Sequence, residues 1–203
     1  EFARIADRLA VDALQAIDAA NSQPYSHIHA PGPGVGGHCI PVYSYFLAVP
    51  ETPGTGALDT DLITAARQIN DDMARYAIGR LGDALGGLEG TTCVVLGLEY
   101  RADVKESRHS SAFGLASALI AAGATAYAHA PLYTDAEIRA HGLEPPPAWP
   151  LPCDALVVQA WHTDYAALDL RAFAGLRAVL DARAALDPAA ITAMGIAYVG
   201  IGR

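Results

Sequence analysis

From Gly86 onward, the sequence alternates short apolar segments with helical ones, and this alternation limits the possible folds more than any other feature. Thr92 to Leu96 is one such apolar segment, and an alanine-rich helical stretch follows it at 110–122. Short buried strands that alternate with helices are typical of a parallel sheet covered by helices on its faces. We therefore expect an α/β domain over residues 86–203. Its strands are predicted at 92–97, 126–130, 155–159, 178–181 and 196–199.

Arginines follow two of the expected strands. Arg101 and Arg108 come after the first strand, and Arg183 comes after the fourth. Ligands of parallel sheets bind at the carboxyl ends of the strands. Two or three guanidinium groups at that edge can hold a diphosphate through paired hydrogen bonds. The sequence therefore predicts an anion site there, and the alternative is that each arginine is a solvated surface charge.

The first 85 residues predict two long amphipathic helices. Apolar side chains recur at helical spacing over 1–20 and again from about Thr60 to about Leu85. Asn21 would end the first helix, and Asp59 or Thr60 can cap the second. Because two helices bury little surface by themselves, we expect their apolar faces to pack on each other and on a second copy of the chain. Packing within one copy is the alternative. The apolar stripe of the first helix consists of Phe2, Ile5, Leu9, Ala13 and Ile17.

Between these helices lies the stretch 31–41, which reads PGPGVGGHCIP. Its four glycines and three prolines exclude a regular helix or strand. Such a stiff loop can bring backbone N–H groups close to a ligand, and it presents Cys39 with His38 beside it. A neighbouring histidine can help keep a thiol ionised, and the thiolate is the reactive form. A glycine and proline turn around a buried cysteine is the alternative. Proline and glycine recur at 48–58, where we expect a linker or surface loop.

Charge and cysteine content exclude several classes of protein. The formal net charge of −9 argues against a nucleic-acid partner. The three cysteines are odd in number and have no CxxC spacing, which indicates a reducing compartment without a disulfide framework or a zinc site. His27 and His29 form a close pair, but two histidines do not predict a metal site. No apolar run has the length of a membrane span, so we expect a cytoplasmic protein that is not in a membrane.

Several of these segments resemble one enzyme family. The loop motif at 32–41, the segment GLEYRADVKESRHS at 97–110, the DAR at 181–183 and the closing YVGIGR are similar to the UDP-glucose/GDP-mannose (nucleotide-sugar) 6-dehydrogenases. The loop is most like the branch that oxidises UDP-N-acetylhexosamines such as UDP-N-acetylmannosamine. The resemblance implies a helical dimerisation segment at 1–85, followed by a Rossmann-like α/β domain that binds the UDP-sugar. It also implies a preceding NAD-binding Rossmann domain, which this chain lacks.

The resemblance further implies an NAD-dependent oxidation of a sugar C6 alcohol to a carboxylate in two steps. Cys39 would form a thiohemiacetal and then a thioester, with a minor role for His38. Arg108 would reach the NAD, which the missing domain would bind for the most part. We therefore expect the chain to be the C-terminal half of a homodimeric enzyme, inactive by itself, that dimerises through residues 1–85. The substrate-binding residues implied are Gly34, Gly36, Gly37, Tyr100, Arg101 and Arg183.

One position departs from the family pattern. The family has an aspartate four residues after the cysteine, and this chain has Tyr43 there. Tyrosine titrates near pH 10, so it is a poor general base at neutral pH. One alternative is therefore an enzyme that does not hydrolyse the thioester. Another is a catalytically inactive, dimeric homologue that only binds nucleotide sugars.

Overall fold

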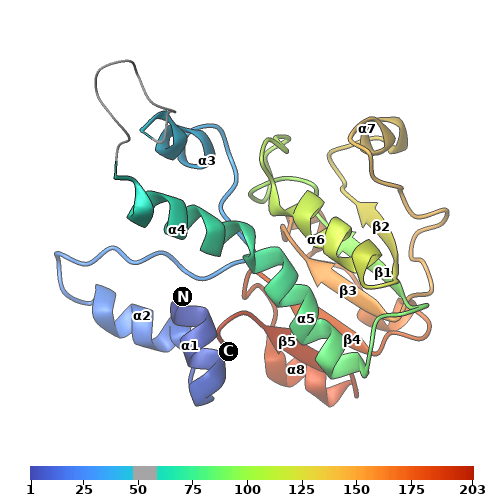
Figure 1. The fold of residues 1–203 in the computed structure, drawn as a ribbon. Coiled ribbons are helices and arrows are strands. Elements are labelled where there is room, and N and C mark those ends of the chain that lie inside the picture. The colour runs from blue at the N-terminus through green and yellow to red at the C-terminus, as the bar shows by residue number, and fades with distance from the viewer. Residues whose placement is uncertain (48–58) are drawn as a thin grey trace.

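The computed structural model describes residues 1–47 and 59–203, and its centre is a five-stranded parallel sheet (Figure 1). The strand order is β2-β1-β3-β4-β5. All four neighbouring pairs are parallel. The predicted α/β class is confirmed, and each strand begins and ends within one residue of its expected bounds. The strands are β1 (Thr92–Leu96), β2 (Thr125–His129), β3 (Ala155–Val158), β4 (Ala178–Asp181) and β5 (Ala197–Gly200).

Alternate residues of the strands enter two separate cores. Val95, Val157 and Leu180 point to one face of the sheet, where α5 and α6 cover them (Figure 1). Leu156 and Val179 point to the other face, which α8 covers. This two-sided burial explains why the strands are almost entirely apolar. The helices of this part are α5 (Met73–Leu85), α6 (Ser111–Ala121), α7 (Asp135–Ala140) and α8 (Pro188–Ala193), with short 3-10 turns η2 (Thr163–Tyr165) and η3 (Leu170–Ala172).

The expected single helix over 1–20 is wrong, because the chain forms two helices, α1 (Phe2–Leu9) and α2 (Ala13–Asn21). Ala10 adopts a left-handed conformation that ends α1. The Asp12 carboxylate then accepts hydrogen bonds from the first amides of α2 and starts a new helix. The predicted end at Asn21 is confirmed.

Within one copy of the chain, the α1 residues of the predicted apolar stripe are not buried. Ala3 and Ala6 are buried, whereas Phe2, Ile5 and Leu9 are 58%, 52% and 66% exposed. The helix thus packs on its alanine face. Packing of the exposed stripe on a second copy stays a prediction.

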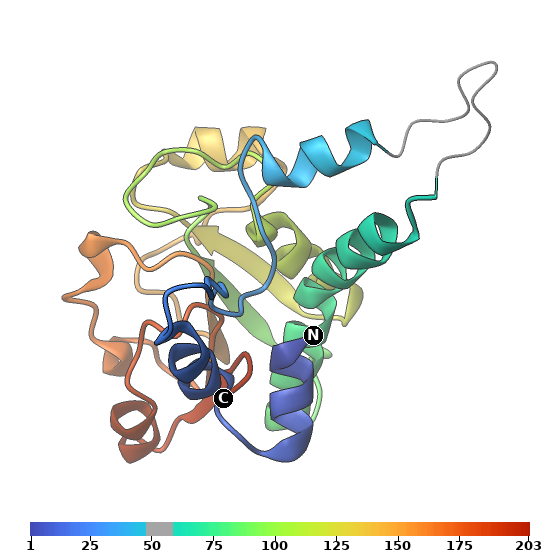
Figure 2. The same ribbon diagram turned by 90° about the vertical axis from the view of Figure 1, so that its left-hand side faces the viewer.

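The second predicted helix is also two helices. α4 (Asp61–Asp71) ends one residue before α5, and Asp72 separates them. Thr60 occupies the N-cap position but its side chain makes no capping hydrogen bond, while Asp59 accepts one at 3.4 Å from the Asp61 amide. No residue of α4 is buried, and Figure 2 shows this helix extending away from the sheet. The short helices α3 (Ile40–Tyr43) and η1 (Ser44–Phe46) lie beside it.

The linker expected at 48–58 lies outside the described residues. In the described part of the chain, no helix combines the length and the apolar character that a membrane crossing requires.

Candidate functional site

The loop between α2 and α3 is held in contact with the segment that follows β1. The Gly37 amide donates to the Arg108 carbonyl oxygen at 2.9 Å. A Cβ atom at Gly36 would lie 2.5 Å from the Tyr100 Cβ and 2.9 Å from the His109 carbonyl oxygen. Only glycine fits at position 36, because any side chain would push the two segments apart.

This contact closes one side of a pocket of about 850 Å³. The pocket is lined by the glycine loop, by α4 and by the two strand ends that carry arginines. It brings together the predicted substrate residues Gly34, Gly36, Tyr100, Arg101 and Arg183. Segments far apart in the sequence therefore meet where the arginines were expected.

Arg183 is built into this pocket rather than solvated at the surface. Its Nε donates to the Gln159 carbonyl oxygen at 2.7 Å, and burial lowers the pKa of its guanidinium. The guanidinium also packs against the loop, since a Cβ at Gly32 would lie 2.9 Å from its Nη1. Arg101 is exposed, and both arginines line a second pocket of about 340 Å³ beside Trp161. The arrangement thus offers two guanidinium groups, one after β1 and one after β4, at the carboxyl ends of the parallel strands.

Cys39 is exposed, so the alternative of a buried cysteine is wrong. It stands at the N-cap of α3, and its carbonyl oxygen accepts from the Tyr43 amide at 2.8 Å. Tyr43 follows Cys39 by one helical turn, and the neighbouring Cys39 thiol raises the pKa of the Tyr43 hydroxyl. Ile40, the next residue, lines the larger arginine pocket, but the Cys39 side chain lies outside its described lining.

His38 pairs with a carboxylate instead of the neighbouring thiol. Its Nε2 lies 2.8 Å from Glu106 Oε2. The Arg108 amide donates to the other carboxylate oxygen at 2.9 Å. These two hydrogen bonds hold the pKa of Glu106 below its usual range, the Arg108 amide contributing most. Arg108 is exposed beside the segment 35–45 that presents Cys39, called here the Cys39 turn.

A buried histidine supports the loop that carries Tyr100 and Arg101. His162 is fully buried; one ring nitrogen, Nε2, lies 2.7 Å from Glu99 Oε2, and the other, Nδ1, accepts from the Asp103 amide at 2.9 Å. The histidine thus holds both ends of the short segment around Arg101. Sequence reasoning missed Glu99 and His162, although a carboxylate directly after an apolar strand is a usable signal.

Two sequence models of one family match the chain. They are the central domain of the UDP-glucose/GDP-mannose dehydrogenase family, at residues 1–72, and its UDP-binding domain, at residues 94–188. The chain belongs to the UDP-glucose/GDP-mannose dehydrogenase family. The resemblance seen in the sequence is therefore confirmed.

Several similar proteins have names that refer to N-acetylated sugars. The chain is 35% identical over 133 residues to UDP-N-acetyl-D-mannosamine dehydrogenase of Methanococcus maripaludis, covering 64% of the chain and 30% of that protein. It is 32% identical to an NDP-N-acetyl-D-galactosaminuronic acid dehydrogenase of Ralstonia nicotianae, over 59% of the chain and 27% of that protein. The solved UDP-D-ManNAc dehydrogenase of Pyrococcus horikoshii matches all of the chain with a TM-score of 0.77 and 26% identity. The chain spans 47% of that structure, so it is less than half the length of the relatives it matches.

Proposed function

We propose that the chain supplies the nucleophilic thiol and the UDP-sugar site of an NAD-dependent nucleotide-sugar 6-dehydrogenase that acts on a UDP-N-acetylhexosamine. The observation that carries this proposal is the pocket in which the glycine loop meets Arg101 and Arg183. The names of the relatives support an N-acetylated sugar.

Arg183 and Arg101 would bind the diphosphate. The partly buried guanidinium of Arg183 is fixed by its bond to Gln159, so little side-chain freedom is lost when an anion binds. Tyr100 and the backbone of Gly34 and Gly36 would contact the sugar side of the pocket. Gly37 acts by shape, because its amide already donates to Arg108.

Cys39 would carry the covalent chemistry. Its sulfur adds to the C6 aldehyde, forming a carbon–sulfur bond while the thiol proton goes to the aldehyde oxygen. Loss of hydride from C6 and of the hydroxyl proton to water converts the resulting thiohemiacetal into a thioester, and water then displaces the Cys39 thiolate and leaves the carboxylate. NAD, when bound, accepts one hydride from C6 in each of the two oxidations. The exposed guanidinium of Arg108, next to the Cys39 turn, fits the anionic diphosphate of that cofactor.

The test is thermal unfolding of the chain in a panel of UDP- and GDP-sugars. Ligands that bind only the folded state raise the melting temperature according to their affinity. We expect UDP-N-acetylhexosamines to raise it and Arg183→Met to abolish the rise. Arg171→Met is the matched control, because Arg171 is an exposed arginine on η3 away from the pocket. A panel without any shift would contradict the proposal.

Tyr43 supports a second candidate, a variant that does not hydrolyse the thioester or does not catalyse at all. The neighbouring Cys39 thiol raises the pKa of its hydroxyl further, so Tyr43 is a poor base at neutral pH. In the protein together with its NAD-binding part, complete turnover would give two NADH per sugar. A stalled enzyme would leave an adduct on Cys39, detected by mass spectrometry. We expect Tyr43→Asp to raise acid formation by a factor on the order of 100. Binding without any NADH would support the inactive homologue.

We also infer a homodimer formed through residues 1–85. Phe2, Ile5 and Leu9 of α1 are exposed, as are Ile40 and Phe46 around α3. Exposed apolar side chains on one helix face, such as Phe2, Ile5 and Leu9 on α1, mark interaction surfaces. Light scattering should give twice the chain mass, and Ile5→Glu should halve it. A monomer at all accessible concentrations would contradict the dimer.

A further inference from the structure

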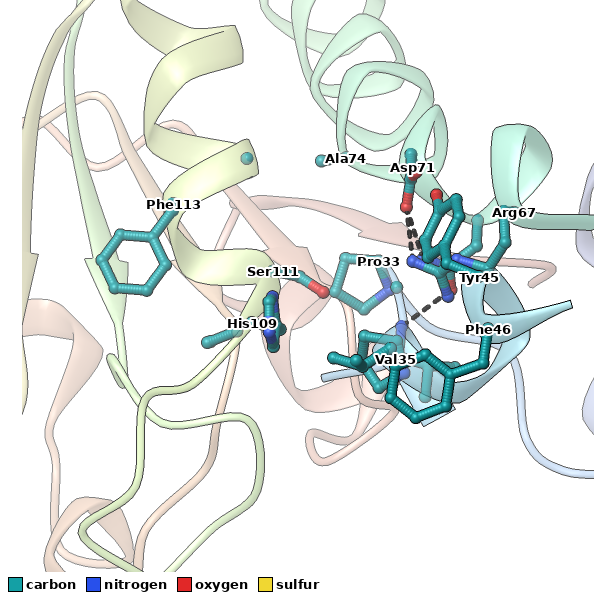
Figure 3. A pocket seen from close by; sticks show the side chains of 16 residues that line it. Pro33, Val35, Tyr45, Phe46, Arg67, Asp71, Ala74, His109, Ser111 and Phe113 are labelled. Carbon is teal, nitrogen blue, oxygen red and sulfur yellow. Dashed lines mark hydrogen bonds and ion pairs between the residues drawn. The ribbon is translucent and has the colours of Figure 1, made fainter. Parts of the chain in front are cut away.

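The last turn of α4 faces the cysteine turn across a pocket of about 660 Å³ (Figure 3). Figure 3 shows Arg67 and Asp71 on α4 pointing toward Val35, which precedes the cysteine, and toward Tyr45, which follows it. The helix therefore has side chains within reach of both ends of the turn that presents Cys39.

One contact holds the turn ahead of the cysteine. Asn70 Oδ1 accepts a hydrogen bond from the Val35 amide at 2.8 Å. The same side chain donates from Nδ2 to Asp71 Oδ1 at 3.0 Å. Because the acceptor end of the amide faces the loop and the donor end faces a carboxylate, the orientation of Asn70 is fixed by both neighbours.

A second contact holds the chain after the cysteine. Arg67 Nη2 lies 2.8 Å from Asp71 Oδ1, and the arginine side chain is only 13% exposed. Its guanidinium carbon lies 5.8 Å from the centre of the Tyr45 ring, within the range of a cation–π contact. The two contacts meet at one oxygen, since Asp71 Oδ1 accepts from both Arg67 and Asn70.

We propose that Asn70, Arg67 and Asp71 are positioning residues that hold the Cys39 turn from both sides and so fix the direction in which the thiol points. The meaning of this arrangement for catalysis rests on the proposed function. The arrangement itself does not rest on the proposed function, because these contacts hold the turn in place without any bound nucleotide sugar. α4 would thus set the direction of the nucleophile without touching substrate.

The experiment compares Asn70→Ala, Asn70→Asp and Gln68→Ala in the 203-residue chain. Asn70→Asp keeps an oxygen for the Val35 amide, and Gln68 is an exposed amide on the same helix. The two measurements are hydrogen exchange of the Val35 amide by NMR and the rate of Cys39 alkylation by iodoacetamide, read by peptide mass spectrometry. The other two cysteines, Cys93 and Cys153, are buried, so alkylation of the native protein reports Cys39.

We expect Asn70→Ala to speed both rates about five-fold, the factor that corresponds to one ordinary hydrogen bond. The turn then opens more often, and the thiol meets the reagent more readily. Asn70→Asp should restore the Val35 exchange rate and most of the alkylation rate. Gln68→Ala should match the unmodified chain in both measurements.

Faster Val35 exchange with unchanged alkylation would overturn the proposal, because the hydrogen bond would then hold the loop without holding the thiol. Unchanged exchange would overturn it as well. Tyr45→Leu keeps the test decisive if Asn70→Ala does not fold, since Tyr45 is 48% exposed and its loss should not unfold the chain. Tyr45→Leu removes the contact on the other side of the turn, so we expect the rate of Cys39 alkylation to rise about two-fold. An unchanged alkylation rate would refute the proposal. Neither measurement requires substrate or NAD, so failure of the proposed function would leave these outcomes interpretable.

Discussion

The α/β part and the helical segment differ in how they are stabilised. Every residue of β3 and β4 is buried, and the sheet has a core on both faces. α4 by contrast buries no residue, and α1 exposes its large apolar side chains. The first part carries its own core, whereas the second carries surface suited to covering by other polypeptide. The comparison teaches that the part with its own core holds the arginines, and the part with exposed apolar side chains holds the thiol.

A small polar cluster ties the two parts together. The Asp7 carboxylate on α1 accepts from the Tyr76 hydroxyl and from Arg80, both on α5 and both at 2.6 Å. The Ala13 amide at the start of α2 donates to the Gly202 carbonyl oxygen at 2.7 Å. Through these bonds the N-terminal helices are attached to α5 and to the chain after β5.

The largest expected effect comes from a matched pair of leucines. Leu156 on β3 is fully buried, and Leu62 on α4 is 84% exposed. Leu156→Ala should lower the free energy of unfolding by about 3 kcal/mol, because it removes buried methyl groups and leaves a cavity. Leu62→Ala should change it by less than about 0.5 kcal/mol. Chemical denaturation measures both, and equal effects would break the comparison between the two parts.

The second largest effect is expected at Asp7, whose side chain is only 7% exposed. Asp7→Ala leaves Arg80 without its carboxylate and should cost about 2 kcal/mol. The loss should be local: hydrogen exchange should rise in α1 and α2 and stay unchanged in the strands. Asp18→Ala, an exposed aspartate on α2, is the control and should cost less than about 0.5 kcal/mol. Equal acceleration in the strands would show that the helical segment is part of one cooperative core.

The sequence predicts the α/β part well because its strands are buried on both faces and read as continuous apolar runs. It predicts the helical segment less well for two local reasons. Asp12 and Ala10 interrupt the first helix, although the apolar spacing continues through them. The spacing also predicts that Phe2 and Ile5 lie on the packing face of the helix, whereas within one copy of the chain Ala3 and Ala6 are buried instead, because alanines allow a closer approach.

The site shows the same limit. Arg183 could be placed at a strand end from the alternation of strands and helices alone. Asn70 and His162 could not, because each acts through a hydrogen bond to the backbone of a distant segment, and such a bond leaves no local pattern. The Tyr43 substitution is visible in the sequence, but its place one helical turn after Cys39 becomes apparent only when α3 forms.

A smaller effect should depend on pH and belong to the α/β part. Burial lowers the pKa of His129, at the end of β2, to about 4, and its ring stacks on Trp149 at 3.6 Å. The unfolded chain binds this proton at about pH 6.5, so stability is complete above that pH and is lost as the pH falls from about 6.5 to about 4. With half-burial taken into account, the loss should be about 1 kcal/mol. His129→Phe keeps an aromatic ring on Trp149 and should flatten this pH window in denaturation curves. If His129→Phe loses the same stability between these pH values as the unmodified chain, other titrating groups cause the loss.

The smallest effect is expected at the ion pair between Asp72 and Arg75, at the junction of α4 and α5. The pair is short, at 2.6 Å, but the arginine side chain is 78% exposed, so water screens the attraction. Arg75→Ala should therefore change the free energy of unfolding by less than about 0.5 kcal/mol, and high salt should abolish even that difference. Denaturation at low and high salt measures both values. A salt-sensitive loss above about 1 kcal/mol would mean that surface charge, rather than contact with the cysteine turn, stabilises the helical segment. The contrast between the two parts would then be one of charge instead of burial.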